Sequence, residues 1–258
     1  MHRRFHLRTT MFQIHNTDIM SHLIDMPDES VDLAVFDPPY PTISGGSNDG
    51  ESGNWERPGG MLTKNDGRVF EMNDIAPEEY LPDLWRVLKP QAHVYMMCNL
   101  LGLRDGLLDV VQREGFEVHN LLPWIKNNVT PNRWYMKNVE YTLFMRKGPA
   151  FSINNKGSKT AATFGDHPLD WPNPTSPKPH PTAKPVSLMK TYIENSSKPG
   201  DVVFDLFMGA GSTGVAAIDC GRQFIGVEAD VLYYNIAKQR MESHRPRRKL
   251  SALDEGLI

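Results

Sequence analysis

Apolar residues in this chain form short continuous runs, and these runs alternate with segments in which apolar residues recur at three- to four-residue spacing. A continuous run bounded by turn residues, such as residues 31–37, predicts a strand buried on both faces, whereas the longer spacing predicts an amphipathic helix. The alternation predicts an α/β fold with a mostly parallel sheet. The predicted strands are residues 12–16, 31–37, 93–98, 116–126, 139–147, 201–207 and 223–229, and the predicted helices are residues 18–26, 76–90, 103–115, 184–197, 212–221 and 231–244.

Three parts of the chain interrupt this alternation. No helical pattern separates residues 116–126 from residues 139–147, so these strands are expected to be antiparallel neighbours. Residues 41–70 are rich in Gly, Ser, Asn and Asp, which predicts a mobile loop. Residues 148–181 are rich in Pro, Asn, Lys and Ser, which predicts either a linker or a small irregular module. The predicted domain is residues 11–242, with loose ends at residues 1–10 and 245–258.

Composition and charge narrow the class of protein. The net charge of −3 excludes a uniformly basic nucleic-acid coat, yet residues 126–190 contain ten Lys and Arg against three Asp and Glu, which predicts a face that meets an anion. The two cysteines, Cys98 and Cys220, suffice neither for a disulfide framework nor for a zinc site. We therefore expect buried thiols, a reducing cytosol and no metal. No apolar run approaches the roughly 18 residues of a membrane span, so no membrane partner is expected.

A glycine-rich turn follows one predicted strand and begins the next helix. Gly209, Gly211 and Gly214 lie in this turn, and Glu228 ends the following strand. This arrangement is typical of a site that binds an adenosine ribose, although a tight turn without a ligand would share the glycines. Only 44 residues follow Gly214, too few to complete a dinucleotide-binding sheet, so upstream strands must complete it. Asp205 would face a pyrophosphate badly and suits a cation such as the amino group of S-adenosylmethionine.

The stretch Asp37-Pro38-Pro39-Tyr40 follows another predicted buried strand. Ligands of parallel sheets gather outside the carboxyl ends of the strands, so Asp37 is expected in the same crevice as the glycine turn. The ionised Asp37 and the rigid Pro38 carbonyl are both acceptors, and together they can bind an NH₂ group. Tyr40 offers a flat face on which a planar base can stack. A proline-stabilised strand exit with Asp37 as a turn cap is the structural alternative.

These motifs together resemble the DNA amino-methyltransferases, which carry [D/N/S]-P-P-[Y/F/W] and F-x-G-x-G. The second motif reads Phe207-Met208-Gly209-Ala210-Gly211 and follows the first, as in the β class of that family. Residues 180–185, HPTAKP, are close to H-P-T-Q-K-P, with Ala183 in place of Gln. Residues 84–96 resemble a further segment, with Gln91 and Ala92 in place of glycines. The resemblance implies a Rossmann-like S-adenosylmethionine-dependent methyltransferase fold, circularly permuted, with a mostly parallel seven-stranded sheet and one antiparallel strand.

The resemblance also assigns residues to the cofactor, S-adenosyl-L-methionine, and to the reaction. Asp18 would contact the adenine amine, although it could equally be a helix N-cap. Glu228 would bind the ribose hydroxyls, and Thr182 and Lys184 would bind the methionine carboxylate. The implied catalytic residues are Asp37, Pro38, Pro39 and Tyr40, and the implied cofactor-binding residues are Asp18, Asp205, Phe207, Gly209, Gly211, Ser212, Thr182, Lys184 and Glu228.

The implied substrate is double-stranded DNA in the bacterial cytosol, with the target base flipped out of the duplex. Target recognition would lie in residues 148–179, where Lys156, Lys159 and Lys178 could contact phosphates or be ordinary solvated lysines. Asp before Pro-Pro favours N6 of adenine, and N4 of cytosine is the alternative. A non-catalytic DNA-binding protein, a dehydrogenase and a homodimeric enzyme each remain open at this point, as does an accompanying restriction nuclease.

Overall fold

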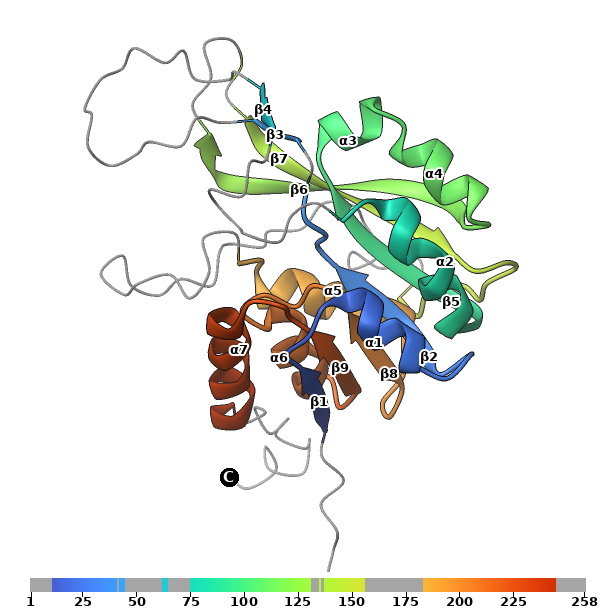
Figure 1. The fold of residues 1–258 in the computed structure, drawn as a ribbon, viewed down its shortest axis with the longest axis vertical. Coiled ribbons are helices and arrows are strands. Elements are labelled where there is room, and N and C mark those ends of the chain that lie inside the picture. Colours follow the sequence, from blue (N-terminus) through green and yellow to red (C-terminus); the bar gives the residue numbers. More distant parts are fainter. Residues whose placement is uncertain are drawn as a thin grey trace, which may run out of the picture.

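The structure is a computed structural model that describes residues 11–40, 42–44, 62–64, 75–130, 135, 137–155 and 183–244. A seven-stranded sheet forms its centre, with the strand order β1-β9-β8-β2-β5-β7-β6 (Figure 1). Neighbours from β1 through β5 are parallel, and β7 is antiparallel to both β5 and β6. The predicted fold class is therefore confirmed. The strands are β1 (Phe12–His15), β2 (Val31–Phe36), β5 (Leu88–Cys98), β6 (Glu117–Thr130), β7 (Lys137–Arg146), β8 (Val202–Asp205) and β9 (Gln223–Val227).

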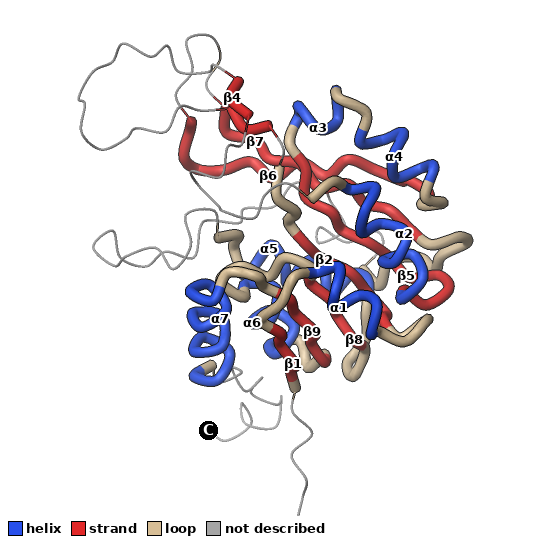
Figure 2. Tube along the Cα trace, viewed as in Figure 1, coloured by secondary structure: helices blue, strands red, loops and turns tan. Residues whose placement is uncertain are grey.

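Helices cover both faces of this sheet (Figure 2). Side chains along β2 alternate between the two faces: Ala34 and Phe36 pack with α1, α2 and α4, whereas Leu33 and Val35 pack with α5, α6 and α7. A strand covered on both sides explains why residues 31–37 form a continuous apolar run. The helices are α1 (Ile19–Asp25), α2 (Pro77–Val87), α3 (Leu100–Arg104), α4 (Leu107–Arg113), α5 (Val186–Ser196), α6 (Ser212–Asp219) and α7 (Val231–Ser243).

The junction between α2 and β5 differs from the predicted helix, which extended over residues 76–90 and so included Pro90. The helix ends at Val87 and β5 begins at Leu88, so Pro90 lies in the strand. Pairing with β2 shifts register between Leu88 and His93, which places a bulge around Pro90 and Gln91. Proline is tolerated there because a bulge leaves backbone groups out of the ladder. Gln91 adopts a positive φ of 69°, a conformation that favours glycine.

The single helix predicted over residues 103–115 is wrong, because the structure has two. The first, α3, ends at Arg104, and α4 begins at Leu107. Gly106, with a φ of 105°, separates them as the N-cap of α4. Such a left-handed residue cannot continue a right-handed helix, so the chain changes direction there.

Two predicted irregular segments are only partly described. Within residues 41–70, β3 (Thr42–Ser44) and β4 (Leu62–Lys64) pair as a small antiparallel sheet, which the prediction of a loop missed. At the start of the 148–179 segment, the Asn154 side chain donates to the carbonyls of Glu194 and Ser197 at the end of α5. The rest of both segments lies outside the described residues, as do residues 1–10 and 245–258. The domain limits of residues 11–242 stay a prediction.

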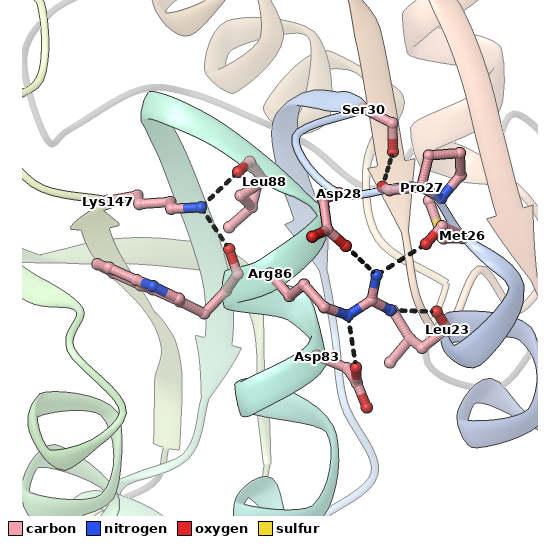
Figure 3. A network of polar contacts seen from close by, with 10 residues as sticks. Leu23, Met26, Pro27, Asp28, Ser30, Asp83, Arg86, Leu88 and Lys147 are labelled. Atoms are coloured by element: carbon pink, nitrogen blue, oxygen red, sulfur yellow. Dashed lines mark hydrogen bonds and ion pairs between the residues drawn. The ribbon is translucent and has the colours of Figure 1, made fainter.

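Arg86 ties the end of α2 to the turn that leads into β2 (Figure 3). Its guanidinium donates to the carbonyls of Leu23 and Met26 and to the carboxylates of Asp28 and Asp83. The two carbonyls lie at the C-terminal end of α1, where the Leu23 carbonyl also accepts from the amide of the C-cap residue Met26. The planar fork of arginine serves four acceptors at once. This contact fixes one end of β2, and Asp37 follows the other.

Both cysteines are free and buried, and burial raises the pKa of Cys98 to about 12 and of Cys220 to about 11. They therefore remain neutral thiols, as expected from the sequence. Within the described part of the chain, no helix combines the length and apolar character that crossing a bilayer requires.

Candidate active site

Four acidic residues lie at one edge of the sheet. The strands β1, β9, β8 and β2 are consecutive parallel neighbours, so their carboxyl ends meet at this edge. Asp205 ends β8, Asp37 and Glu228 directly follow β2 and β9, and Asp18 lies just beyond β1. The structure thus brings together residues that are up to 210 positions apart. This edge is where parallel α/β sheets bind their ligands.

Asp205 is buried, with 3% of its surface exposed. Burial, helped by the neighbouring Asp37 and Glu228, raises the pKa of its carboxyl to about 7. The Thr213 hydroxyl and the Phe207 amide, which lies 3.1 Å away, donate to this carboxylate. Three mutually repelling acids beside a glycine turn favour a cationic ligand, and the residues therefore fit the positively charged methionine end of S-adenosylmethionine.

The glycine turn between β8 and α6 needs its glycines. Gly209 and Gly211 have φ values of 50° and 76°, in the left-handed region. A Cβ atom on Gly211 would lie 3.0 Å from the Cβ of Ala237 and 3.3 Å from its Cα, which would push against the backbone of α7. Packing alone therefore explains part of the motif. The turn leads directly into α6, whose first residue, Ser212, is buried.

Glu228 links the glycine turn to the end of β9. Its carboxylate accepts from the Gly209 amide at 2.9 Å and from the Asp230 amide at 2.9 Å. Burial raises the pKa of this carboxyl, and the two amides oppose that rise. Each oxygen keeps a second lone pair, so both amides can stay bound while the carboxylate accepts from a ribose hydroxyl.

Phe207 and Asp18 are two further predicted cofactor contacts near this edge of the sheet. The Phe207 ring lies 5.3 Å from the Tyr80 ring and 6.2 Å from the Phe36 ring, so an aromatic cluster holds the start of the turn. Asp18 is the N-cap of α1, and its Oδ1 accepts from the Ser21 amide at 2.9 Å, a bond that lowers its pKa. The capping alternative for Asp18 is therefore observed, and its contact with adenine stays a prediction.

The Asp37-Pro38-Pro39-Tyr40 stretch brings its acid and its aromatic ring together. The Tyr40 hydroxyl donates to Asp37 Oδ1 at 2.5 Å. Burial raises the pKa of Tyr40 well above its ordinary value, and Asp37 raises it further, so the phenol keeps its proton. Pro38 is buried and the segment is neither helix nor strand. Tyr40 therefore serves as a hydrogen-bond donor to Asp37 as well as a candidate stacking surface.

Lys184 contacts Asp37 directly. Its ammonium Nζ lies 2.7 Å from Asp37 Oδ2 and 3.2 Å from Glu140 Oε2. A second cation, Lys126, lies 2.9 Å from Glu140 Oε1. Burial alone would lower the pKa of Lys184, but Asp37 and Glu140 outweigh it and raise the value, so Lys184 stays charged. The binding of a methionine carboxylate by Lys184 stays a prediction.

Glu140 and Lys126 are the site residues that sequence reasoning missed, together with Thr213. One signal was present: Lys126 ends a predicted strand, and Glu140 is the second residue of its predicted antiparallel neighbour. Thr182 and the predicted phosphate contacts Lys156, Lys159 and Lys178 lie outside the described residues.

Comparisons with known proteins agree with this geometry. Residues 31–239 match the N6/N4 family model described as DNA methylase. The chain is 30% identical to the type II methyltransferase M2.DpnII of Streptococcus pneumoniae, over 94% of each protein. It is 29% identical to the type II methyltransferase M2.LlaDCHI of Lactococcus lactis subsp. cremoris, over 88% of this chain and 87% of the other.

Solved structures share the fold. The M1.HpyAVI–SAM complex has a TM-score of 0.64 at 24% identity, over 89% of this chain and 99% of the other. The cytosine-N4-specific PvuII DNA methyltransferase has a TM-score of 0.63 at 18% identity, over 89% and 86%. With the family match over most of its length and the acids, glycine turn and Asp-Pro-Pro-Tyr stretch at one sheet edge, this chain belongs to the N6/N4 family of DNA methyltransferases, which use S-adenosylmethionine as methyl donor.

Proposed function

We propose that this protein is a site-specific methyltransferase that acts on N6 of adenine, in a base flipped out of double-stranded DNA. The observation that carries the proposal is the position of Asp37, next to the Pro38 carbonyl and at the same sheet edge as Asp205 and Glu228. This position puts acceptors for an amine beside acids that suit a cationic cofactor.

The chemistry requires acceptors more than a strong base. An amine on a nucleobase is a poor nucleophile because its lone pair is delocalised into the ring. Asp37 and the Pro38 carbonyl each accept one N–H, which favours a pyramidal nitrogen whose lone pair points away from the ring. Tyr40 stacks on the base and offsets part of the cost of flipping it. S-adenosylmethionine, when bound, supplies the methyl group, and the methylated ammonium is acidic enough to lose its proton to water.

The geometry of the sheet edge supports a set of proposed cofactor contacts. In this proposal Asp205 faces the methionine amino group, Glu228 accepts from the ribose hydroxyls, and Asp18 contacts the adenine amine while still capping α1. The backbone at Gly209 and Gly211 approaches the ligand closely because neither carries a side chain. The remaining proposed contacts are Phe207, Ser212 and Thr182, whereas the ammonium of Lys184 lies 2.7 Å from Asp37 Oδ2.

DNA contacts are proposed on chemical grounds. Lys156, Lys159 and Lys178 would bind phosphates, and residues 148–179 would recognise the target sequence. The bacterial relatives with type II methyltransferase names support a cytosolic enzyme of a restriction–modification system. A homodimer would help so small a recognition segment to span its site.

N4 of cytosine is the alternative target, because both exocyclic amines fit the same pair of acceptors. Asp rather than Ser before Pro-Pro supports adenine. Plasmid DNA methylated by the protein and digested to nucleosides distinguishes the two by mass spectrometry. We expect N6-methyladenine, and N4-methylcytosine in its place would reverse the assignment of the base while leaving the amine chemistry intact.

The role of Asp37 is tested by substitution. Asp37→Ala removes an acceptor that is needed at the moment of transfer, so the rate should fall by at least roughly 100-fold while S-adenosylmethionine still binds. Asp37→Asn keeps the side-chain volume in case the alanine variant folds poorly. Asp109→Ala, on the exposed face of α4, is the control and should transfer methyl groups at the normal rate. An unchanged turnover rate in the Asp37→Ala variant would contradict the proposed mechanism.

A further inference from the structure

A chain of alternating charges runs from the outer strands of the sheet to Asp37. It begins with Lys126 on β6, continues with Glu140 on β7 at 2.9 Å, then Lys184 at 3.2 Å, and ends with Asp37 at 2.7 Å. These residues come from four separate segments of the sequence. Nothing in the proposed methyl transfer accounts for Glu140 or Lys126.

The strand pairings bring these charged residues to the edge of the sheet where Asp37 lies. Tyr141 pairs with Cys98, the last residue of β5, so its neighbour Glu140 lies at the carboxyl end of β5. Glu140 itself pairs with Trp124, which places Lys126 two residues further along β6. The pairing of β5 with β2 brings this end of β5 beside the exit of β2, where Asp37 lies.

Burial makes these charges depend on one another. The side chains of Lys184 and Lys126 are only 9% and 15% exposed. A charge that has lost its water is retained only when an opposite charge or a hydrogen bond replaces it, and removal of one partner leaves the other unpaired. Glu140 is the partner of both lysines, so it connects Lys126 to Lys184 and, through Lys184, to Asp37.

We propose that Glu140 and Lys126, acting through Lys184, are positioning residues that set the orientation of the Asp37 carboxylate for methyl transfer. This inference rests on the proposed function of Asp37. Lys184 holds Oδ2 and the Tyr40 hydroxyl holds Oδ1, so the carboxylate is held at both oxygens and cannot rotate freely. Each oxygen still has a lone pair for the amine of the base.

Glu140 has a second effect on Asp37 as an acceptor. If Lys184 were paired with Asp37 alone, its ammonium would neutralise most of the negative charge of the carboxylate. Asp37 would then be a weaker acceptor for the amine of the base. Because Lys184 is shared with Glu140, part of its charge is already balanced. The loss of Glu140 should therefore shift Lys184 toward Asp37 and slow transfer without changing the cofactor site.

The test compares two matched glutamate-to-glutamine substitutions at opposite ends of the β6–β7 pair. Glu140→Gln breaks the chain, whereas Glu117→Gln breaks the ion pair of Glu117 with Arg146 at the other end of β6 and β7. We expect Glu140→Gln to lower the single-turnover methylation rate roughly tenfold, because small errors of alignment are costly in transfer. Its dissociation constant for S-adenosylmethionine, measured by calorimetry, should stay near that of the parent. Glu117→Gln should change neither quantity.

Lys184 variants distinguish positioning from cofactor binding. If Lys184 positions Asp37, Lys184→Met lowers the rate at saturating S-adenosylmethionine and leaves the dissociation constant nearly unchanged, and Lys184→Arg recovers part of the rate because it keeps the cation. If Lys184→Met instead weakens cofactor binding and keeps the saturated rate, Lys184 is a ligand of the methionine carboxylate and the proposal fails. Lys126→Met should slow transfer less than Glu140→Gln, because it lies one step further from Asp37.

The outcomes also separate this proposal from the proposed function. If Asp37→Ala is inactive but Glu140→Gln matches Glu117→Gln, the charge chain is only structural and the function of Asp37 stands. If Asp37→Ala keeps its rate, the proposed function itself is wrong. Should Glu140→Gln unfold, Glu140→Asp keeps the charge but shortens the side chain, and the same split between rate and cofactor affinity then decides.

Discussion

At the edge of the sheet where the four acids lie, some ordinary residue types have unusual protonation behaviour. Asp205 is an ordinary aspartate in the sequence, but burial and two neighbouring acids raise its pKa to about 7. Lys184, in contrast, keeps its charge although it is buried, because Asp37 and Glu140 surround it. The site therefore contains both an aspartate that titrates near neutral pH and a buried lysine that stays protonated.

Binding of S-adenosylmethionine should therefore depend on pH. Below about pH 7 the Asp205 carboxyl is largely protonated and does not attract the cationic methionine end, so affinity should rise as pH increases from 5 to 7. The limiting rise is about tenfold for each pH unit. Calorimetry across this range checks the expectation, and Asp205→Asn should show weak binding with little of this pH dependence. A flat profile in the unmodified protein would show that Asp205 binds no cation.

The same group has the opposite effect on the stability of the free protein. The pKa of Asp205 in the folded state lies above its ordinary value of 3.8. The stability that Asp205 contributes to the fold is therefore fully present below pH 3.8, and it is lost as the pH rises through about 7. A bound cation would oppose this loss, which links cofactor binding to stability above neutral pH.

At the scale of elements, the bulge in β5 strains the backbone at Gln91. Gln91 has a φ of 69° and still uses its amide, which donates to the Lys147 carbonyl at 3.0 Å. A residue with a Cβ in this conformation costs about 1–2 kcal/mol relative to glycine.

Gln91→Gly should therefore stabilise the protein. The relief of strain exceeds the roughly 0.5–1 kcal/mol by which glycine favours the unfolded chain, so a net gain of about 0.5–1 kcal/mol is expected. For a protein of this length the melting temperature should rise by roughly 2 °C, which calorimetry can measure. Gln91→Val is the opposite control: a β-branched side chain fits this conformation worse, so it should lower the melting temperature. Equal melting temperatures for all three would show that the bulge relaxes without cost.

At the scale of the whole molecule, the proposed cofactor site joins the ends of several strands. Contacts to Asp205, Glu228 and the glycine turn would connect β8, β9 and α6, and Asp18 would add the start of α1. A ligand that binds here only in the folded state stabilises the entire sheet.

S-adenosylmethionine should accordingly raise the melting temperature. At about 100 times its dissociation constant it adds about 2.7 kcal/mol, which corresponds to roughly 5–10 °C for a protein of this length. NAD at the same concentration should have no effect, because a pyrophosphate would meet the Asp205 carboxylate. The Asp205→Asn variant should lose most of the shift. A shift with NAD and none with S-adenosylmethionine would support a dehydrogenase instead.

The sequence alone determined the order and type of most elements and the chemistry of the motifs. Continuous apolar runs predicted the buried strands, and the absence of a helix between residues 116–126 and 139–147 predicted the antiparallel pair. These features depend on neighbouring residues, so a local pattern carries them. The break at Gly106 was missed because helical spacing continues across it.

Only the tertiary structure decided which residues meet. Glu140 lies more than 100 positions from Asp37 in the chain, and Lys126 comes from yet another strand. They form one charge chain because β7 pairs with β5 and β5 with β2. An apolar run tells that a strand is buried but not which strand it pairs with, since backbone hydrogen bonds are alike for every sequence. Strand order, which emerges only when the whole sheet packs, therefore decides that Glu140 and Lys126 lie near Asp37.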